Sequence, residues 1–336
     1  WDLNAAPATD KGQCRIYCRV SAGTTGGSGL IAAYGADGKI LWSWHVWVTD
    51  YQPDATGDAT VLEPENKRKL KFTFQVSQPQ LPMMDRNLGA MAGYTKVPPS
   101  AEERFRTHGF FYEWGRKEPF PGSYSNRDIT SIPLPSTTLT APLAGILSLY
   151  KPVFKEFSIN NRNGPVSYRT AIQNPLDIYK HKNANNQVYW LNDTERKANS
   201  YAYFRVWGTT KGIYDPCPAG WRVAQASEYY IFCAGGNTKT GNNPAIMNKT
   251  SYTTDKGFLF LFDNNKNTTW VALSGYYQGQ NYRGIGEFVY YWTGTGAYKQ
   301  NGIDISHYRI TTNNQDLDAS GYEHEALPLR CIQEKP

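Results

Sequence analysis

The sequence predicts an α+β protein in which short strands and long loops dominate. Charged residues make up 19% of the 336 positions, whereas an average globular chain carries about 25%. Aromatic residues reach 14%, and the 30 glycines and 20 prolines indicate many turns. Several stretches also alternate apolar and polar residues with the period of a strand. This combination is typical of a loop-rich β protein that works outside the cell.

The first part of the chain, residues 1–78, is expected to be a β-rich N-terminal segment. Strand patterns cover residues 13–20 and 30–50, and residues 70–76 alternate in the same way. Ala36-Asp37-Gly38-Lys39 predicts a hairpin turn, because glycine tolerates the positive φ angle that such turns need. One face of the strand that follows is strongly apolar and holds Trp42, Trp44, Val46 and Val48. We interpret His45, on the other face, as a packed strand residue rather than a catalytic base.

Residues 79–336 are expected to form the main domain, with an insertion of long loops and short elements at about 120–200. A short helical turn is predicted at 101–106. Residues 213–237 predict a turn, a strand and then a helix, which Ser227 would cap and Gly235-Gly236 would end. Short strands are predicted at 186–190, 201–207, 257–263, 269–274, 288–294, 306–311 and 326–333.

The charge pattern argues against two classes of partner. The net charge is +6, and the densest basic cluster, Lys67-Arg68-Lys69, is typical of a solvated loop. Nucleic-acid binding would require basic residues gathered along one face, and the sequence shows no such stripe. No stretch approaches the roughly 18 consecutive apolar residues of a membrane span. The chain starts at Trp1, so we expect a mature or excised piece of a longer protein.

The sequence has five cysteines. Cys14 and Cys18 would lie on one face of a strand about 13 Å apart, which is too far for a disulfide. We interpret them as small buried apolar residues or as partners of an upstream segment, and we place Cys233 on an apolar helix face. The odd number leaves at least one thiol free or paired with another chain. No zinc-binding spacing is present, and neither a metal nor a cofactor is predicted.

No catalytic motif stands out in the sequence. Gly284-Ile285-Gly286 precedes no predicted helix, so it does not indicate a dinucleotide site. Glu323-His324-Glu325 places two carboxylates beside an imidazole, but on a strand the glutamates and the histidine would face opposite ways. We interpret this tripeptide as an exposed polar turn.

Five motifs, in order, resemble one known family. They are DRNLGA at 85–90, GFFYEWGRKEPF at 109–120, YDPCPAGWRV at 214–223, LSGY with YWTGT at 273–276 and 291–295, and PLRCI at 328–332. Together they resemble the fibrobacter-type major paralogous domain, which is found in surface and pilus-tip proteins of Bacteroidetes. The stretch LWSWHVWVTDY at 41–51 is similar to the segment that precedes this domain, so the resemblance covers about 40–336.

The resemblance implies a C-type-lectin-like fold with long loop insertions in residues 79–336, preceded by a segment, 1–78, that would end a pilin-like domain. Cys217 and Cys331 match the two family cysteines, so a disulfide between them is implied, and Trp221 and Trp292 match core positions. The family has Pro-Thr where this chain has Ala224-Gln225. Gln52-Pro53-Asp54 equals a tripeptide of calcium-dependent lectins, but it lies outside the lectin-like segment, and we interpret it as a turn.

The implied function is adhesion at the cell surface or pilus tip, through Tyr- and Asn-rich loops within 275–325. The ligand would be an extracellular glycan or protein, because exposed tyrosines among polar residues suit adaptable binding surfaces. The candidate contacts are Tyr276, Tyr277, Tyr282, Arg283, Tyr298, His307, Tyr308, Asn313 and Tyr322. Receptors of this fold that are diversified by retroelements carry varied residues at this place. We therefore hypothesise that this part of the chain is diversified, which requires a template repeat and a reverse transcriptase near the gene.

Two alternatives stay open. Formylglycine-generating oxidases have the same fold, but their chemistry needs a pair of active-site cysteines that bind copper. A structural pilus subunit would instead pair its N-terminal strands with a neighbouring pilin by strand addition. Both the adhesin and the pilus subunit would lie outside the cell, at the surface or in a fimbrium, anchored to the outer membrane through a region upstream of Trp1.

Overall fold

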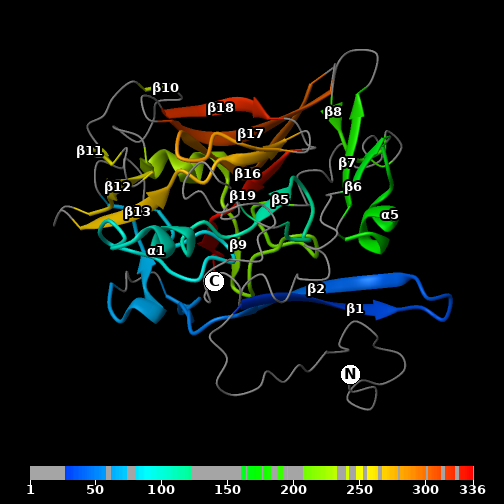
Figure 1. The fold of residues 1–336 in the computed structure, drawn as a ribbon, viewed down its shortest axis with the longest axis horizontal. Helices are drawn as coiled ribbons and strands as arrows, with labels where there is room; N and C mark the ends of the chain where they lie inside the picture. The colour runs from blue at the N-terminus through cyan, green and yellow to red at the C-terminus, as the bar shows by residue number, and fades with distance from the viewer. Residues whose placement is uncertain are drawn as a thin grey trace.

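The computed structural model is mostly β, with a few short helices and several small sheets that are almost entirely antiparallel (Figure 1). It describes residues 27–57, 62–73, 80–120, 122, 160–163, 165–175, 177–182, 188–192, 195, 207–232, 240–241, 247–252, 256–263, 267–278, 281–299, 302–311, 315–321 and 325–335. The strand predicted at 13–20 lies outside these residues, as do Cys14, Cys18, Cys233 and Gly235-Gly236. Of the strand predicted at 70–76, residues 74–76 lie outside and only Leu70 of the rest belongs to a strand. Of the strand predicted at 201–207, only Trp207 is described, and it lies in a turn.

The predicted N-terminal hairpin is confirmed. β1 (Gly27–Tyr34) pairs antiparallel with β2 (Ile40–Val48), and Gly38 takes a φ of 75° in the turn. In Figure 1 this hairpin lies along the lower side of the molecule. The face opposite the apolar one contacts the rest of the protein, since the ring of His45 packs edge-on against Phe110 at 5.3 Å. His45 is therefore a packed strand residue, as expected.

A central four-stranded sheet joins distant parts of the chain. Its order is β3 (Lys69–Leu70), β4 (Met83–Met84), β20 (Cys331–Gln333) and β9 (Trp221–Val223). A second sheet has the order β15 (Asn281–Arg283), β14 (Tyr276–Gln278), β19 (Ala326–Pro328) and β5 (Phe111–Glu113). The expected strand at 326–333 is thus split between the two sheets, and β3 of the N-terminal segment shares a sheet with the C-terminal strand.

The remaining sheets surround this centre. β16 (Phe288–Lys299), β17 (Gly302–Thr311), β18 (Gln315–Gly321) and β10 (Thr240–Gly241) form the upper sheet in Figure 1. β11 (Met247–Tyr252), β12 (Gly257–Leu261) and β13 (Thr268–Ala272) form another. β6 (Asn160–Asn163), β7 (Asp177–Lys182) and β8 (Val188–Tyr189) lie in the expected insertion together with α5 (Tyr168–Gln173).

The helices are short. α1 (Ala101–Phe105) is the predicted helical turn, and the Ser100 side chain caps it by accepting from the Glu103 amide. The helix predicted after Trp221 is a 3-10 helix, η4 (Ala226–Phe232). Ser227 lies inside it rather than capping it, so that prediction is wrong. The carboxylate of Glu228 instead accepts from the Gln225 amide at 2.7 Å, which satisfies a donor at the start of the helix. A second 3-10 helix, η2, spans Glu65–Lys67.

Aromatic side chains fill the core. One cluster gathers Trp114, Trp190, Trp207, Trp221 and Trp292, so the core roles expected of Trp221 and Trp292 are confirmed. A second cluster gathers phenylalanines of β12 around Tyr229 and Tyr291. A third, smaller one lies between β5, β7, β14 and β19. Within the described residues, no helix is long and apolar enough to cross a membrane.

Candidate ligand-binding surface

Three aromatic rings meet at the surface between β14 and β16. We call Tyr276, Phe288 and Tyr290 the aromatic triad. The Tyr290 ring stacks on Tyr276 at 4.9 Å between centroids and on Phe288 at 4.8 Å, with interplanar angles of 21° and 18°. The third pair, Tyr276 and Phe288, is tilted at 5.7 Å. Each side chain is partly buried, so the rings are supported from beneath and still reach solvent.

Backbone contacts bring these rings together. Gly275, just before β14, donates its amide to the Phe288 carbonyl at 2.8 Å, which places the start of β14 beside the start of β16. Gly284 takes a φ of 63°, which favours glycine. A Cβ atom there would lie 1.8 Å from the Phe288 ring. The turn therefore requires glycine both for its conformation and for the space that Phe288 occupies.

Polar groups border the triad. Arg283 is exposed and is the register partner of Tyr276 across β14 and β15. Gln278 donates its side-chain amide to the carboxylate of Glu325, which is only 5% exposed. Burial raises the pKa of Tyr276 to about 12, the negative charge of Glu325 adds to this, and Arg283 opposes it. The interpretation of Glu325 as part of an exposed turn is wrong, because β19 begins beside it and carries it inward.

The other face of β14 and β15 belongs to the core. Tyr277 is only 4% exposed, and its ring packs edge-on against Tyr282 at 5.3 Å. Tyr282 also contacts Phe111 at 6.0 Å. The period of two in a strand sends these two tyrosines inward and Tyr276 outward. We therefore remove Tyr277 from the candidate contacts, while Tyr282 keeps only part of its surface.

The remaining candidate contacts are placed less closely. Tyr298 lies on β16, and His307 and Tyr308 lie on β17. The prediction that the contacts lie on loops is therefore wrong for these residues, which belong to strands. The register pairs Tyr298 with Ile303 and His307 with Trp292, some way along the sheet from the pair of Phe288 and Thr311. Asn313 and Tyr322 lie outside the described residues. The structure thus brings together Tyr276 and Arg283 from the predicted set.

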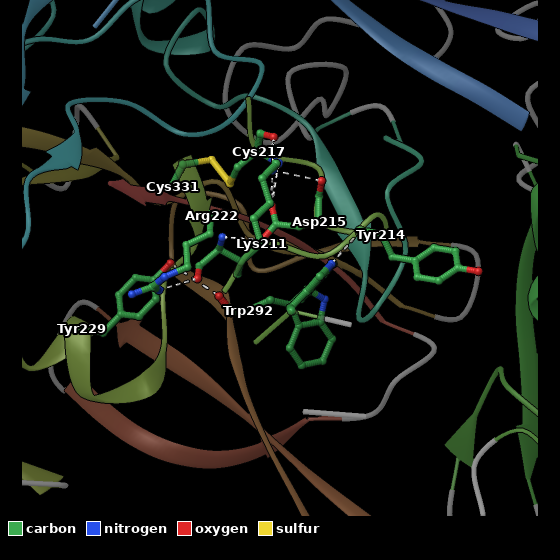
Figure 2. The surroundings of a disulfide bond; sticks show 10 residues. Lys211, Tyr214, Asp215, Cys217, Arg222, Tyr229, Trp292 and Cys331 are labelled. Atoms are coloured by element: carbon green, nitrogen blue, oxygen red, sulfur yellow. Dashed lines mark hydrogen bonds and ion pairs between the residues drawn. A yellow bond between two sulfur atoms is a disulfide. The ribbon is translucent and has the colours of Figure 1, made fainter. Parts of the chain in front are cut away.

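Cys217 and Cys331 form a disulfide, the pairing that the family resemblance implies (Figure 2). Cys331 opens β20 and pairs with Val223 of β9. The carboxylate of Asp215 accepts from the backbone amides of Cys217 and Val223, both at 2.9 Å. Lys211 donates to the same carboxylate at 3.1 Å and to the Cys217 carbonyl. Asp215 and Lys211 therefore fix the backbone beside the disulfide, which indicates a structural role.

A buried cluster of charges deserves testing as an active site, because perturbed carboxylates often mark one. Arg116 forms ion pairs with Glu113 and, at 3.5 Å, with Glu118. Burial raises the pKa of Glu113 to about 7, against the opposing charge of Arg116. Arg116 also donates to the Asp177 carbonyl at 2.8 Å, and Lys117 donates to the Ser43 carbonyl at 2.7 Å. Because these groups link β5 to β2 and β7, we interpret the cluster as a structural cross-link.

The family-like motifs are mainly structural. Asp85, Arg86 and Asn87 of the first motif are buried, as are Trp114 and most residues of the second. The Asp85 carboxylate accepts from Arg86 at 2.7 Å and pairs with Arg68 at 3.2 Å. Residues that hold one another inside the protein cannot contact a ligand directly. A binding function therefore has to use residues outside these buried positions, such as the partly exposed Tyr276 at the end of the LSGY motif.

The described residues contain no group of three or more His, Cys, Asp or Glu side chains that could hold a metal ion. Asp54 of the Gln-Pro-Asp tripeptide accepts from the amide and the hydroxyl of Thr56, both at 2.8 Å, which is the geometry of a turn. Searches against protein-family models, curated proteins and solved structures find no match to this chain.

Sequence reasoning missed four members of this surface: Phe288, Tyr290, Gln278 and Glu325. Phe288 and Tyr290 alternate with the buried Val289 and Tyr291, which is the strand signal that separates an outer from an inner face. The sequence alone does not assign either set to the outside, because both consist of large apolar or aromatic residues. The contact of Gln278 with Glu325 joins residues 47 positions apart and leaves no local signal.

Proposed function

We propose that this chain is an adhesin of the cell surface or pilus tip that binds an extracellular glycan or protein through the aromatic triad. The observation that carries the proposal is the stacking of Tyr276, Tyr290 and Phe288 at the surface, beside the exposed Arg283. Rigid aromatic rings offer contact area at a low entropic cost, which is why binding surfaces are enriched in them.

Two further features support this proposal. The five motifs resemble a surface-protein family with a C-type-lectin-like fold, and we propose that fold for residues 79–336. The Cys217–Cys331 disulfide fits an extracellular location, because disulfides persist in oxidising compartments. We do not favour the oxidase alternative, since the copper-binding pair it needs would have to be two free thiols. A mass map showing Cys217 and Cys331 unpaired would revive it.

The test is a binding screen against oligosaccharides and extracellular host proteins, followed by variants. Tyr276→Ala should weaken binding at least tenfold, because truncating a central aromatic contact costs about 2 kcal/mol or more. Tyr34→Ala is the matched control, since Tyr34 is 63% exposed and lies on the distant hairpin. Equal binding by the two variants at unchanged melting temperature would place the ligand elsewhere and refute the proposal.

A second function, subunit assembly, is favoured by the hairpin. β1 and β2 carry no charged residue and no proline, the usual protections of an edge strand. Within the described residues they form a two-stranded sheet, so each has an unpaired edge. Three exposed apolar residues lie on this hairpin: Ile31 at 38%, Leu41 at 58% and Tyr34 at 63%. We propose that a strand of a neighbouring pilin pairs there.

This second function can be separated from the first. Replacing Ile31 by Lys should abolish incorporation into fimbriae and leave ligand binding intact, because a charge on an edge strand opposes pairing. Tyr276→Ala should do the reverse. Normal incorporation of the Ile31→Lys variant would show that the hairpin edge is not used.

A further inference from the structure

The size of the aromatic triad limits what can bind there. An aromatic side chain has about 150–250 Å² of surface, and each of the three is more than half buried. Together they expose roughly 300 Å² at most. A stable protein interface needs about 800 Å² on each partner. The triad is therefore small for a folded protein partner and comparable to one or two sugar rings.

The arrangement of the rings favours a flat ligand with C–H groups on its face. The planes of Tyr276 and Tyr290, and of Tyr290 and Phe288, differ by only 21° and 18°. Aromatic faces carry partial negative charge and attract polarised C–H groups in addition to their dispersion contacts. One face of many pyranose rings presents such C–H groups. The stacking also holds the rings in place before binding, which lowers the entropic cost.

The border of the triad is polar. Arg283 is exposed, and among the described residues its side chain makes no ion pair or hydrogen bond. Its guanidinium carries five N–H donors. Gln278 ends β14, and its side chain donates to the carboxylate of Glu325 beside β19, the neighbour of β14 on the side away from β15. A ligand with an apolar face and a polar edge matches this layout better than a purely apolar one.

We infer that the aromatic triad binds a glycan, with a pyranose face on Tyr276 and Tyr290 and with Arg283 donating to an oxygen of the sugar edge. This inference rests on the proposed binding function and names its ligand class. The oxygen can belong to a hydroxyl group of a neutral sugar or to the carboxylate of an acidic one. Either source uses the same donor chemistry, and the experiment below separates them.

Deglycosylation of the ligand distinguishes a sugar from a protein partner, and substitutions at Tyr290 test whether the aromatic ring makes the contact. The probes are an array of neutral and acidic oligosaccharides, and a mucin glycoprotein before and after enzymatic deglycosylation. Tyr290→Phe keeps the ring and should bind within about twofold of the original protein, whereas Tyr290→Leu keeps apolar volume without the ring and should lose at least tenfold. Melting temperatures of the two variants provide the folding control, and Tyr290→Phe preserves the test if Tyr290→Leu is unstable.

Substitutions at Arg283 distinguish the two sources of the oxygen. Arg283→Gln should weaken binding to acidic sugars more than tenfold if a carboxylate is bound, and weaken all sugars about equally if a hydroxyl group is bound. Arg283→Lys should restore binding in part in the first case. Unchanged binding to every sugar by Arg283→Gln would overturn its assigned role.

The two proposals fail in different ways. Two results would overturn the glycan inference and leave the binding function in place. The first is mucin binding that depends on the triad but survives deglycosylation. The second is binding that Tyr276→Ala weakens but Tyr290→Leu retains. Binding that no triad variant weakens, or no binding to any sugar or protein, would overturn both. Loss of binding on deglycosylation together with loss in Tyr290→Leu is the expected result.

Discussion

Two histidines are held neutral in the protein interior. Burial lowers the pKa of His45 to about 4 and that of His108 to about 3, the latter helped by the charge of Arg104. The imidazole ring of His45 lies against Phe110, where the charged form would lose its hydration. Each histidine that stays neutral in the folded state therefore makes folding dependent on pH.

The sign of this dependence follows from the proton count. Between pH 6.5 and about 4 the unfolded chain binds a proton at His45 and the folded protein does not, so stability falls as the pH falls. The lowered pKa of His45 corresponds to a loss of at most about 3 kcal/mol of folding free energy at low pH. The loss is smaller than this limit because the side chain is only partly buried. His45→Phe should lose less stability than the original protein between pH 7 and pH 4 in urea unfolding.

The contribution of His45 is the difference between the pH dependence of the unfolding free energy in the original protein and in His45→Phe. Glu113 acts in the opposite direction, because its raised pKa makes folding take up a proton between pH 4.5 and about 7. His108 remains in both proteins and keeps its own acid sensitivity. Parallel curves for His45→Phe and the original would show that His45 does not contribute.

At the scale of elements, tight turns position the aromatic triad. The turn before β16 depends on Gly284, whose missing Cβ leaves room for the Phe288 ring. The hairpin turn at Gly38 has a similar φ, 75°, but a Cβ there would have no atom within 4 Å. The two glycines share a backbone conformation and differ only in their surroundings.

This contrast gives a matched pair of variants. Gly38→Ala should cost about 1–2 kcal/mol, the strain of a left-handed residue with a Cβ, and should not affect ligand binding. Gly284→Ala should cost more, because Phe288 must also move, and should weaken binding through the displaced ring. Urea unfolding and the binding assay check both effects. Equal costs for the two variants would mean that Phe288 adapts freely.

The buried charges around Arg116 connect three elements. Arg116→Met should destabilise the protein by about 3–5 kcal/mol, because it leaves buried carboxylates without their partner. The control is Arg106→Met, which removes a partly exposed pair with Glu103 at 2.9 Å and should cost about 0.2–1 kcal/mol. Urea unfolding of both variants measures the difference. A cost below 1 kcal/mol at Arg116 would argue against the cross-link.

At the scale of the whole molecule, the disulfide joins cysteines 114 positions apart. It connects the loop before β9 to the first residue of β20. Cross-linking a loop of this length limits the freedom of the unfolded chain. Replacing both cysteines by Ala should therefore lower the free energy of unfolding by about 2–5 kcal/mol.

Reduction provides the control for this prediction. Dithiothreitol should destabilise the original protein by a similar amount and leave the double variant unchanged. Urea unfolding with and without the reductant measures both. A double variant as stable as the oxidised protein would mean that native-state strain offsets the gain.

Local patterns predicted much of this fold and little of its surface. Alternation located the two hairpin strands and β12, β13, β16 and β17, and Gly38 located the hairpin turn, because both signals depend on neighbouring residues. It did not locate β14, β15 or β18, which lie where loops were predicted. The start of η4 was missed, since its first donor is satisfied by the Glu228 carboxylate, which Arg222 holds in place, and not by Ser227. The triad was missed in part, since it requires Gly275 to meet Phe288 across a loop. Contacts between distant residues leave no periodic trace in the sequence.

The covalent link between β9 and β20 also determines how the protein responds to cleavage. A protease that cuts the chain once between residues 218 and 330 produces two fragments that remain joined through sulfur. If the cut falls between Trp221 and Trp292, each fragment carries one of these two core residues. Both fragments then stay in one molecule. Such a nicked protein would migrate as a single species on a gel until it is reduced. In a protease-rich environment, this bond protects the integrity of the molecule even after its chain is broken.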